Sequence, residues 1–125
     1  MNRRKITIML LSAAAVMLVG SQAFADKSSV EISAPAAVKK GSTVTIKLTV
    51  THKGNNFMHY TNWAYINING KEAARWDFSS GKRPESEVFT REITYTASTP
   101  LVIEAEANCN IHGSAGKKSA KVAVK

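Results

Sequence analysis

Alternation of apolar and polar residues is the feature of this sequence that most restricts its fold. The segment STVTIKLTVTH, residues 42–52, carries an apolar side chain at every second position. Its apolar face is formed by Val44, Ile46, Leu48 and Val50. A period of two is the repeat of a β-strand, because successive side chains point to opposite faces of a sheet. The segment LVIEAEANC, residues 101–109, alternates in the same way, and its expected inward residues are Leu101, Ile103, Ala105 and Ala107.

Five further segments carry strand signals and are separated by turn residues. They are SSVEIS (28–33), HYTNWAYININ (59–69), KEAARWDF (71–78), EVFTREITYT (87–96) and SAKVAVK (119–125). Asn69-Gly70 is a strong hairpin signal, and SSGKRPES (79–86) predicts a surface loop. About seven short strands in a chain of this length favour an all-β, immunoglobulin-like β-sandwich.

The N-terminus has the layout of a secretory signal peptide. Three basic residues at positions 3–5 precede an apolar run over positions 6–20, and alanines stand at positions 23 and 25. Small residues at the −3 and −1 positions mark a cleavage site, and the run is shorter than the ~20 residues of a membrane span. We therefore expect residues 1–25 to be a signal peptide. Residues 26–125 would form one exported, periplasmic domain without a membrane span. The Arg-Arg pair leaves the twin-arginine route open beside the general secretory one.

The charge of the chain restricts its partners. The formal net charge of +8 falls to +5 once the three basic residues at positions 3–5 are removed. The remaining basic residues are spread along the chain without an interleaved aromatic stripe, so we expect no nucleic-acid partner. A mildly positive surface favours the approach of small anions.

All three histidines and the only cysteine lie in two short segments. His52 and His59 lie in THKGNNFMHY, and Cys109 and His112 lie in CNIHG. Strand parity places His52 and Cys109 next in the inward-facing series of their strands, at strand ends where loops close the sandwich. Thiolate and imidazole together favour iron, copper or zinc. The clustering predicts a metal site; a buried inert cysteine with surface histidines is the alternative.

The two segments resemble a known family. CNIHG resembles the C-N-x-H-G signature of the superoxide reductases, the neelaredoxin and desulfoferrodoxin group. HKGNNFMHYTNWAYI resembles that family's H-P-M-x-x-x-H-x-I-x-W-I segment, with Trp63 and Ile66 near its hydrophobic positions. The resemblance implies an immunoglobulin-like sandwich holding a mononuclear, non-haem iron with four equatorial histidines and one axial cysteine thiolate.

The same resemblance assigns ligands and an activity. It implies that His52, His59 and His112 are equatorial ligands and that Cys109 is the axial one. The implied reaction is the one-electron reduction of superoxide to hydrogen peroxide. A separate electron-donor protein, which the sequence does not identify, would return the iron to its ferrous state.

The sequence departs from the family pattern around the first histidine. No histidine precedes His52, where the family has a Glu-Lys-His loop, and Lys53 replaces the proline that follows. The first two histidines are seven positions apart rather than six. Lys53 is the candidate to replace the loop lysine that assists the incoming anion.

Three functional classes stay open. The first is an iron oxidoreductase of superoxide reductase type. The second is an iron or copper electron carrier, in which Met58 would be a weak axial ligand to copper. The third is a metal-free accessory module with the same fold. The oligomeric state is also open, and a homo-oligomer is compatible with all three.

Overall fold

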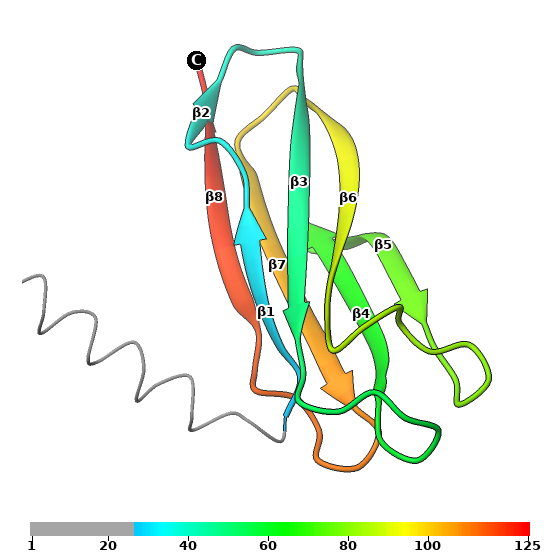
Figure 1. Ribbon diagram of the computed structural model, residues 1–125. Helices are drawn as coiled ribbons and strands as arrows, with labels where there is room; N and C mark the ends of the chain where they lie inside the picture. The colour runs from blue at the N-terminus through cyan, green and yellow to red at the C-terminus, as the bar shows by residue number, and fades with distance from the viewer. Residues whose placement is uncertain (1–26) are drawn as a thin grey trace, which may run out of the picture.

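The structure is a computed structural model that describes residues 27–125, and these residues form eight strands in two sheets (Figure 1). One sheet has three strands in the order β1-β3-β6, and the other has five in the order β2-β8-β7-β4-β5. The strand bounds are β1 Ser29–Ser33, β2 Ala37–Val38, β3 Ser42–Thr51, β4 Thr61–Ile68, β5 Lys71–Asp77, β6 Val88–Ala97, β7 Leu101–Cys109 and β8 Lys118–Val124. The expected signal peptide lies outside the described residues.

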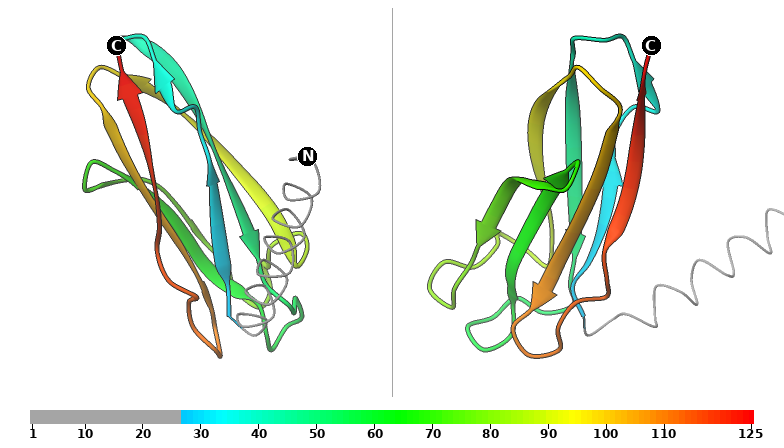
Figure 2. Two further views of the ribbon diagram at one scale, coloured as in Figure 1. Left: turned by 90° about the vertical axis from the view of Figure 1, so that its left-hand side faces the viewer. Right: turned by 180° about the vertical axis from the view of Figure 1, so that it is seen from behind.

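The two sheets pack face to face, which confirms the all-β sandwich (Figure 2). Each of the seven segments with strand signals forms a strand. The additional strand is β2, a two-residue segment that pairs in parallel with β8. Between residues 27 and 125 there is no helix that is long and apolar enough to cross a membrane.

Strand parity is as the alternation predicts. In β3 the even-numbered apolar residues are buried and the threonines and lysine between them are exposed or half-buried. In β7 the odd-numbered residues from Leu101 to Cys109 are buried. The core between the sheets is closed by residues from both, chiefly Ile46, Leu48, Ile66, Leu101 and Ile103, each at most 1 % exposed. Its burial supplies the main driving force for folding.

The hairpin between β4 and β5 turns at Asn69-Gly70, as the sequence indicates. Asn69 has a φ of 52° and Gly70 a φ of 82°, so both residues are in the left-handed region that a type I′ turn requires. The expected loop at 79–86 lies between β5 and β6.

Three connections gather at one end of the sandwich, at the bottom of Figure 1. They are the β3–β4 loop (52–60), the β5–β6 segment (78–87) and the β7–β8 loop (110–117). Strands β3 and β7 both end there, and β4 begins there (Figure 1). Both segments that carry histidine and cysteine, residues 51–60 and 109–113, therefore lie at this end of the sandwich.

Candidate metal centre

His52 is the first residue of the β3–β4 loop and continues the inward face of β3. It is 2 % exposed, beside a Val50 that is fully buried. Its backbone N–H donates to the carbonyl of Glu87 at 2.9 Å, which fastens the strand end to the β5–β6 segment. A polar ring is thus held at the mouth of the apolar core.

The protonation of the His52 ring follows from its one hydrogen bond. Nδ1 lies 2.8 Å from the carbonyl oxygen of Gly54. Because a carbonyl oxygen only accepts, Nδ1 carries the proton. Burial lowers the pKa of His52 and outweighs the hydrogen bond to Gly54, which raises it. The ring is therefore neutral, and Nε2 presents a lone pair.

Nε2 of His52 is buried and has no hydrogen-bond partner. Buried polar atoms in folded proteins are nearly always paired, because an unpaired one costs about 1–3 kcal/mol. A lone pair of neutral imidazole that is turned away from water and left without a donor is typical of a metal ligand.

His59 lies near the end of the same loop and stands edge-on to His52, with ring centroids 4.6 Å apart. The side chain of Asn56 fixes its backbone by accepting the N–H groups of Met58 and His59, each at 3.0 Å. Gly54 makes room for the ring: a Cβ at position 54 would lie 2.7 Å from Nδ1 of His59. The loop therefore needs glycine at this point.

Cys109 ends β7 and is 1 % exposed. Its Sγ accepts the backbone N–H groups of Ile111 and His112 at 3.4 and 3.3 Å. The turn is closed by paired backbone hydrogen bonds between Cys109 and Gly113, which has a φ of 84°. These backbone contacts hold the sulfur in place at the end of β7.

The four predicted residues meet in one cluster. The ligand atoms of His52, His59 and Cys109 all lie within 4.8 Å of one another. His112 joins them from the β7–β8 loop: its Nδ1 is 3.1 Å from Nε2 of His59 and 3.9 Å from Sγ of Cys109. His112 is exposed, whereas His52 and Cys109 are buried. Nitrogen and sulfur donors converging with one buried unpaired nitrogen fit a transition-metal ion of borderline softness.

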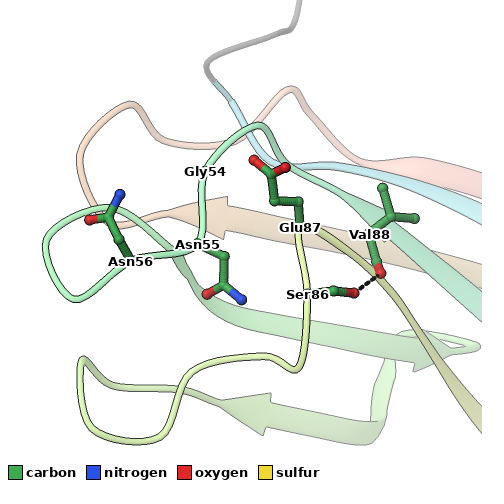
Figure 3. Close-up of a pocket in the computed structure, with 6 residues that line it drawn as sticks. All are labelled: Gly54, Asn55, Asn56, Ser86, Glu87 and Val88. Carbon is green, nitrogen blue, oxygen red and sulfur yellow. Dashed lines mark hydrogen bonds between the residues drawn. The ribbon is translucent and has the colours of Figure 1, made fainter.

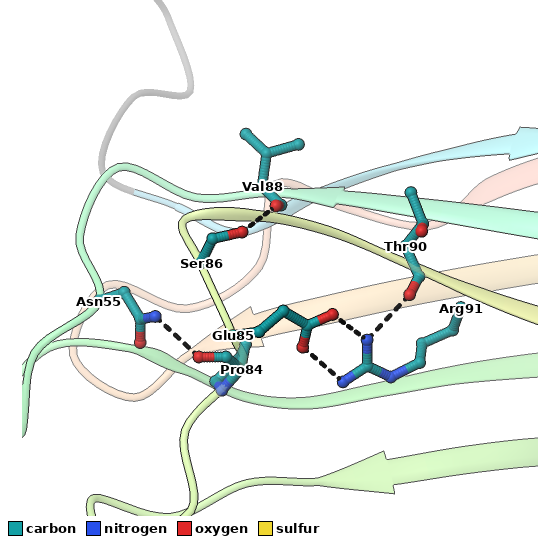
Figure 4. A network of polar contacts seen from close by, with 7 residues as sticks. All are labelled: Asn55, Pro84, Glu85, Ser86, Val88, Thr90 and Arg91. Carbon is teal, nitrogen blue, oxygen red and sulfur yellow. Dashed lines mark hydrogen bonds and ion pairs between the residues drawn. The ribbon is translucent and has the colours of Figure 1, made fainter.

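The β3–β4 loop is also tied to the β5–β6 segment, as Figure 4 shows. Asn55 Nδ2 donates to the carbonyl of Pro84 at 2.8 Å. The segment is anchored in turn to β6, because Arg91 donates to both oxygens of Glu85 at 2.8 and 3.0 Å. This ion pair lowers the pKa of Glu85. The β3–β4 loop, which carries two histidines, is therefore hydrogen-bonded to a segment that is itself anchored to β6.

An open depression of about 660 Å³ lies between the β3–β4 loop and the β5–β6 segment (Figure 3). It is lined by Gly54, Asn55, Asn56, Ser86, Glu87 and Val88. Its one carboxylate belongs to Glu87, next to the segment that holds His52. Negative charge on this side disfavours the approach of an anion through the depression.

Two further residues named from the sequence lie on the surface. Lys53 is exposed, and Met58 is 64 % exposed. The sequence has no fourth histidine, and β1 begins beside the cluster. Ser28, just before β1, is fully buried and bonds to the hydroxyl of Thr61 at 2.8 Å, and Thr61 pairs with Cys109.

Sequence reasoning missed two residues that shape the cluster, Gly54 and Asn110. The carbonyl of Gly54 accepts a hydrogen bond from His52, and the absence of a Cβ at Gly54 leaves room for the ring of His59. The available signal was a glycine two positions after His52. Asn110 lies inside the CNIHG motif, and its side chain contacts the opposite loop at Met58 and Tyr60.

The comparisons with known proteins agree on family and fold. The desulfoferrodoxin family model matches residues 21–116. A superoxide reductase (neelaredoxin) from Ignicoccus hospitalis has a TM-score of 0.63 at 21% identity, covering 79% of this chain and 82% of that one. A putative superoxide reductase from Thermotoga maritima has a TM-score of 0.59 at 24% identity, covering 78% and 86%.

The fold is also shared more widely. The sulfur carrier protein SoxY from Chlorobium limicola f. thiosulfatophilum has a TM-score of 0.55 at 12% identity, covering 76% of this chain and 74% of that one. No curated protein gives a significant match to this chain. At these identities the structural matches show the sandwich and not its chemistry.

Proposed function

Because this chain belongs to the desulfoferrodoxin family, we propose that it is an exported iron protein that reduces superoxide to hydrogen peroxide. The solved structures of similar fold include proteins described as superoxide reductases. The donor set of histidine nitrogen and cysteine sulfur is one that iron accepts. The unidentified electron-donor protein would restore the reduced state after each turnover.

The unpaired Nε2 of His52 is the observation that carries this proposal. A structural histidine in the same place would pair both nitrogens or give way to an apolar residue, because a buried polar atom without a partner costs free energy. Here the carbonyl of Gly54 occupies Nδ1 and leaves Nε2 unpaired, and a ring nitrogen of His52 lies within 4.8 Å of the ligand atoms of His59 and Cys109.

We assign the ligands as His52, His59, His112 and Cys109. A ferrous ion held by these residues would supply the one electron that, with two protons, reduces superoxide to hydrogen peroxide. His52 contributes a neutral imidazole held by the carbonyl of Gly54. Cys109 contributes a sulfur that two backbone N–H groups hold in place. His59 and His112 have ring nitrogens 3.1 Å apart, a contact that a shared ion would replace.

Access to the cluster is expected from the side of His59 and His112. His112 is exposed and His59 half-buried, whereas His52 and Cys109 are closed off by the core. Glu87 repels anions on the other side. Lys53, exposed beside His52, is the proposed cation that assists the approaching anion.

Export is part of the proposal. Residues 1–25 would be removed as a signal peptide, leaving a domain of residues 26–125 in the periplasm. N-terminal sequencing of the protein isolated from its host tests this, with Asp26 as the expected first residue. An uncleaved Met1 terminus would contradict it.

The central experiment combines metal analysis with single-turnover kinetics. Protein purified anaerobically from its host should hold one iron per chain. Mixing the reduced protein with superoxide, by pulse radiolysis, should oxidise the metal rapidly and form peroxide without dioxygen. Loss of the thiolate-to-metal absorption band in Cys109→Ser, with the sandwich still folded by circular dichroism, would tie the metal to this cluster.

Three other results would support a different function. Stoichiometric copper with little iron would indicate an electron carrier. A fully iron-loaded protein that superoxide does not oxidise would leave an iron carrier as the better account. Protein that takes up no metal under any condition would be an accessory module with a degenerate site.

A further inference from the structure

Asn110 joins the two loops that carry the cluster. Its side-chain Oδ1 accepts the backbone N–H of Tyr60 at 2.9 Å, and its Nδ2 donates to the carbonyl of Met58 at 3.0 Å. Its own backbone N–H donates to the carbonyl of Tyr60 at 3.0 Å. One residue of the β7–β8 turn therefore makes three hydrogen bonds to the β3–β4 loop.

These hydrogen bonds end on the two residues that flank His59. Met58 and Tyr60 stand on either side of it in sequence, so the side chain of Asn110 spans the backbone from which the His59 ring projects. In the sequence, Asn110 follows Cys109 directly and precedes His112 by two positions. The same residue is thus fixed to one ligand segment by covalent bonds and to the other by hydrogen bonds.

The amide of Asn110 is engaged at both ends by backbone groups of the β3–β4 loop, and its Oδ1 also lies 4.0 Å from the Sγ of Cys109. Its donor and acceptor each bind a backbone group, so the amide orientation is determined and no free donor faces the cluster. Asn110 is also exposed, so its hydrogen bonds are not needed to satisfy buried groups in the core. A polar link at an exposed loop contributes little to folding, but it determines the distance between the loops it joins.

We propose that Asn110 is a positioning residue that holds His59 in register with Cys109 and His112, so that ligands from two loops face one metal ion. Partners that orient metal ligands usually change metal affinity by about 10–100-fold when they are removed. The inference rests on the proposed metal site and extends it to a residue that is not itself a ligand.

The chain offers a matched control at the opposite end of the sandwich. Asn69 uses its side chain in the same way: Oδ1 accepts the N–H of Val102 at 2.8 Å, and Nδ2 donates to the carbonyl of Pro100 at 3.2 Å. Asn69 also has a positive φ of 52°, which alanine tolerates less well than asparagine. Asn69→Ala should therefore destabilise the fold at least as much as Asn110→Ala.

The test is titration of the metal-free full-length protein and its variants with Co²⁺. Cobalt reports both affinity and geometry, through the thiolate-to-metal band and the ligand-field bands. Asn110→Ala should weaken Co²⁺ binding by about tenfold or more and alter the ligand-field bands. Asn69→Ala should leave both unchanged while lowering the melting temperature of the metal-free protein as much or more.

A second variant serves if Asn110→Ala does not fold. Asn110→Asp keeps the acceptor for Tyr60 N–H and loses the donor to Met58. Its added charge attracts a cation by itself, so the criterion for this variant is an altered set of ligand-field bands and not affinity. Native bands in Asn110→Asp would count against the proposal.

The possible outcomes distinguish a failure of the positioning role of Asn110 from a failure of the proposed metal site. If the unaltered protein binds Co²⁺ and Asn110→Ala binds it equally well with the same bands, the positioning role is wrong and the metal site stands. If the unaltered protein binds no Co²⁺, the proposed metal function fails and the inference fails with it.

Discussion

The ring of His59 packs directly on the bare Cα of Gly54, where a Cβ atom would lie 2.7 Å from Nδ1. The carbonyl of the same glycine accepts the Nδ1 proton of His52 at 2.8 Å. Gly54 also has a φ of 132°, a backbone conformation that residues with a side chain rarely adopt. One glycine therefore determines the placement of two histidines.

Replacing Gly54 with alanine should displace His59 and weaken metal binding by about 10–100-fold, the range for partners that orient ligands. Gly41→Ala is the matched control, because Gly41 also has a positive φ, of 85°, but nothing lies within 4 Å of its added Cβ. Co²⁺ titration and thermal unfolding measure the two effects. If both variants lost stability equally and bound metal equally, the contact with His59 would have no role in the site.

The core gives a second prediction. Leu48 is fully buried and lies between Ile46 and Val50 on the inward face of β3, whereas Lys47 is exposed. Leu48→Ala should lower the free energy of unfolding by about 2–5 kcal/mol, because it removes apolar contacts and leaves a cavity. Lys47→Ala should change it by less than about 0.5 kcal/mol. Urea unfolding of both variants measures the difference, and equal effects would contradict the strand parity.

That parity is the part of the fold that could be predicted from the sequence. Strict alternation in β3 and β7 leaves one arrangement that buries the apolar residues, so the inward positions of His52 and Cys109 follow from it. The turn at Asn69-Gly70 was equally clear, because both residues tolerate a positive φ. The short strand β2 could not be foreseen, since two residues carry no periodicity and its partner β8 is distant in sequence.

The composition of the histidine and cysteine cluster was predictable, but its internal geometry was not. The residue types in CNIHG and the histidine segment indicated the cluster. The tautomer of His52 depends on the carbonyl of Gly54, and the side chain of Asn110 is hydrogen-bonded to the opposite loop. Contacts of this kind join a side chain to a backbone group of a folded loop, and a sequence pattern does not encode them directly.

The outer face of the five-stranded sheet gives a prediction about pH. Tyr65 Oη donates to Glu106 at 2.9 Å, and burial followed by this hydrogen bond raises the pKa of Tyr65 to about 12. A tyrosine with a raised pKa keeps its proton more firmly when folded. Its contribution to stability is therefore complete below the ordinary tyrosine value of about 10 and is lost as the pH rises through about 12.

The measurement is the difference in phenolate absorbance between the protein and Tyr65→Phe during alkaline titration. The midpoint of the difference should lie at about 12. Glu106→Gln should lower it, because the carboxylate that disfavours the phenolate is removed. A difference titration centred at about 10 would show that neither burial nor Glu106 affects this tyrosine.

The last prediction separates a ligand from a structural residue at His52. The buried Nε2 without a partner costs about 1–3 kcal/mol in the metal-free protein, which offsets much of what the Gly54 hydrogen bond contributes. His52→Leu continues the apolar series of β3, so the free energy of unfolding of the metal-free protein should change by less than about 1 kcal/mol.

Metal should stabilise the unaltered protein and His52→Leu by different amounts. At a free metal concentration 1,000 times Kd the unaltered protein should gain about 4 kcal/mol, whereas His52→Leu should gain far less. Urea unfolding with chelator and then with Fe²⁺ under anaerobic conditions measures both quantities. A His52→Leu protein that is as unstable without metal as Leu48→Ala would show that the imidazole supports the fold, and equal stabilisation by metal in both proteins would show that His52 is not a ligand.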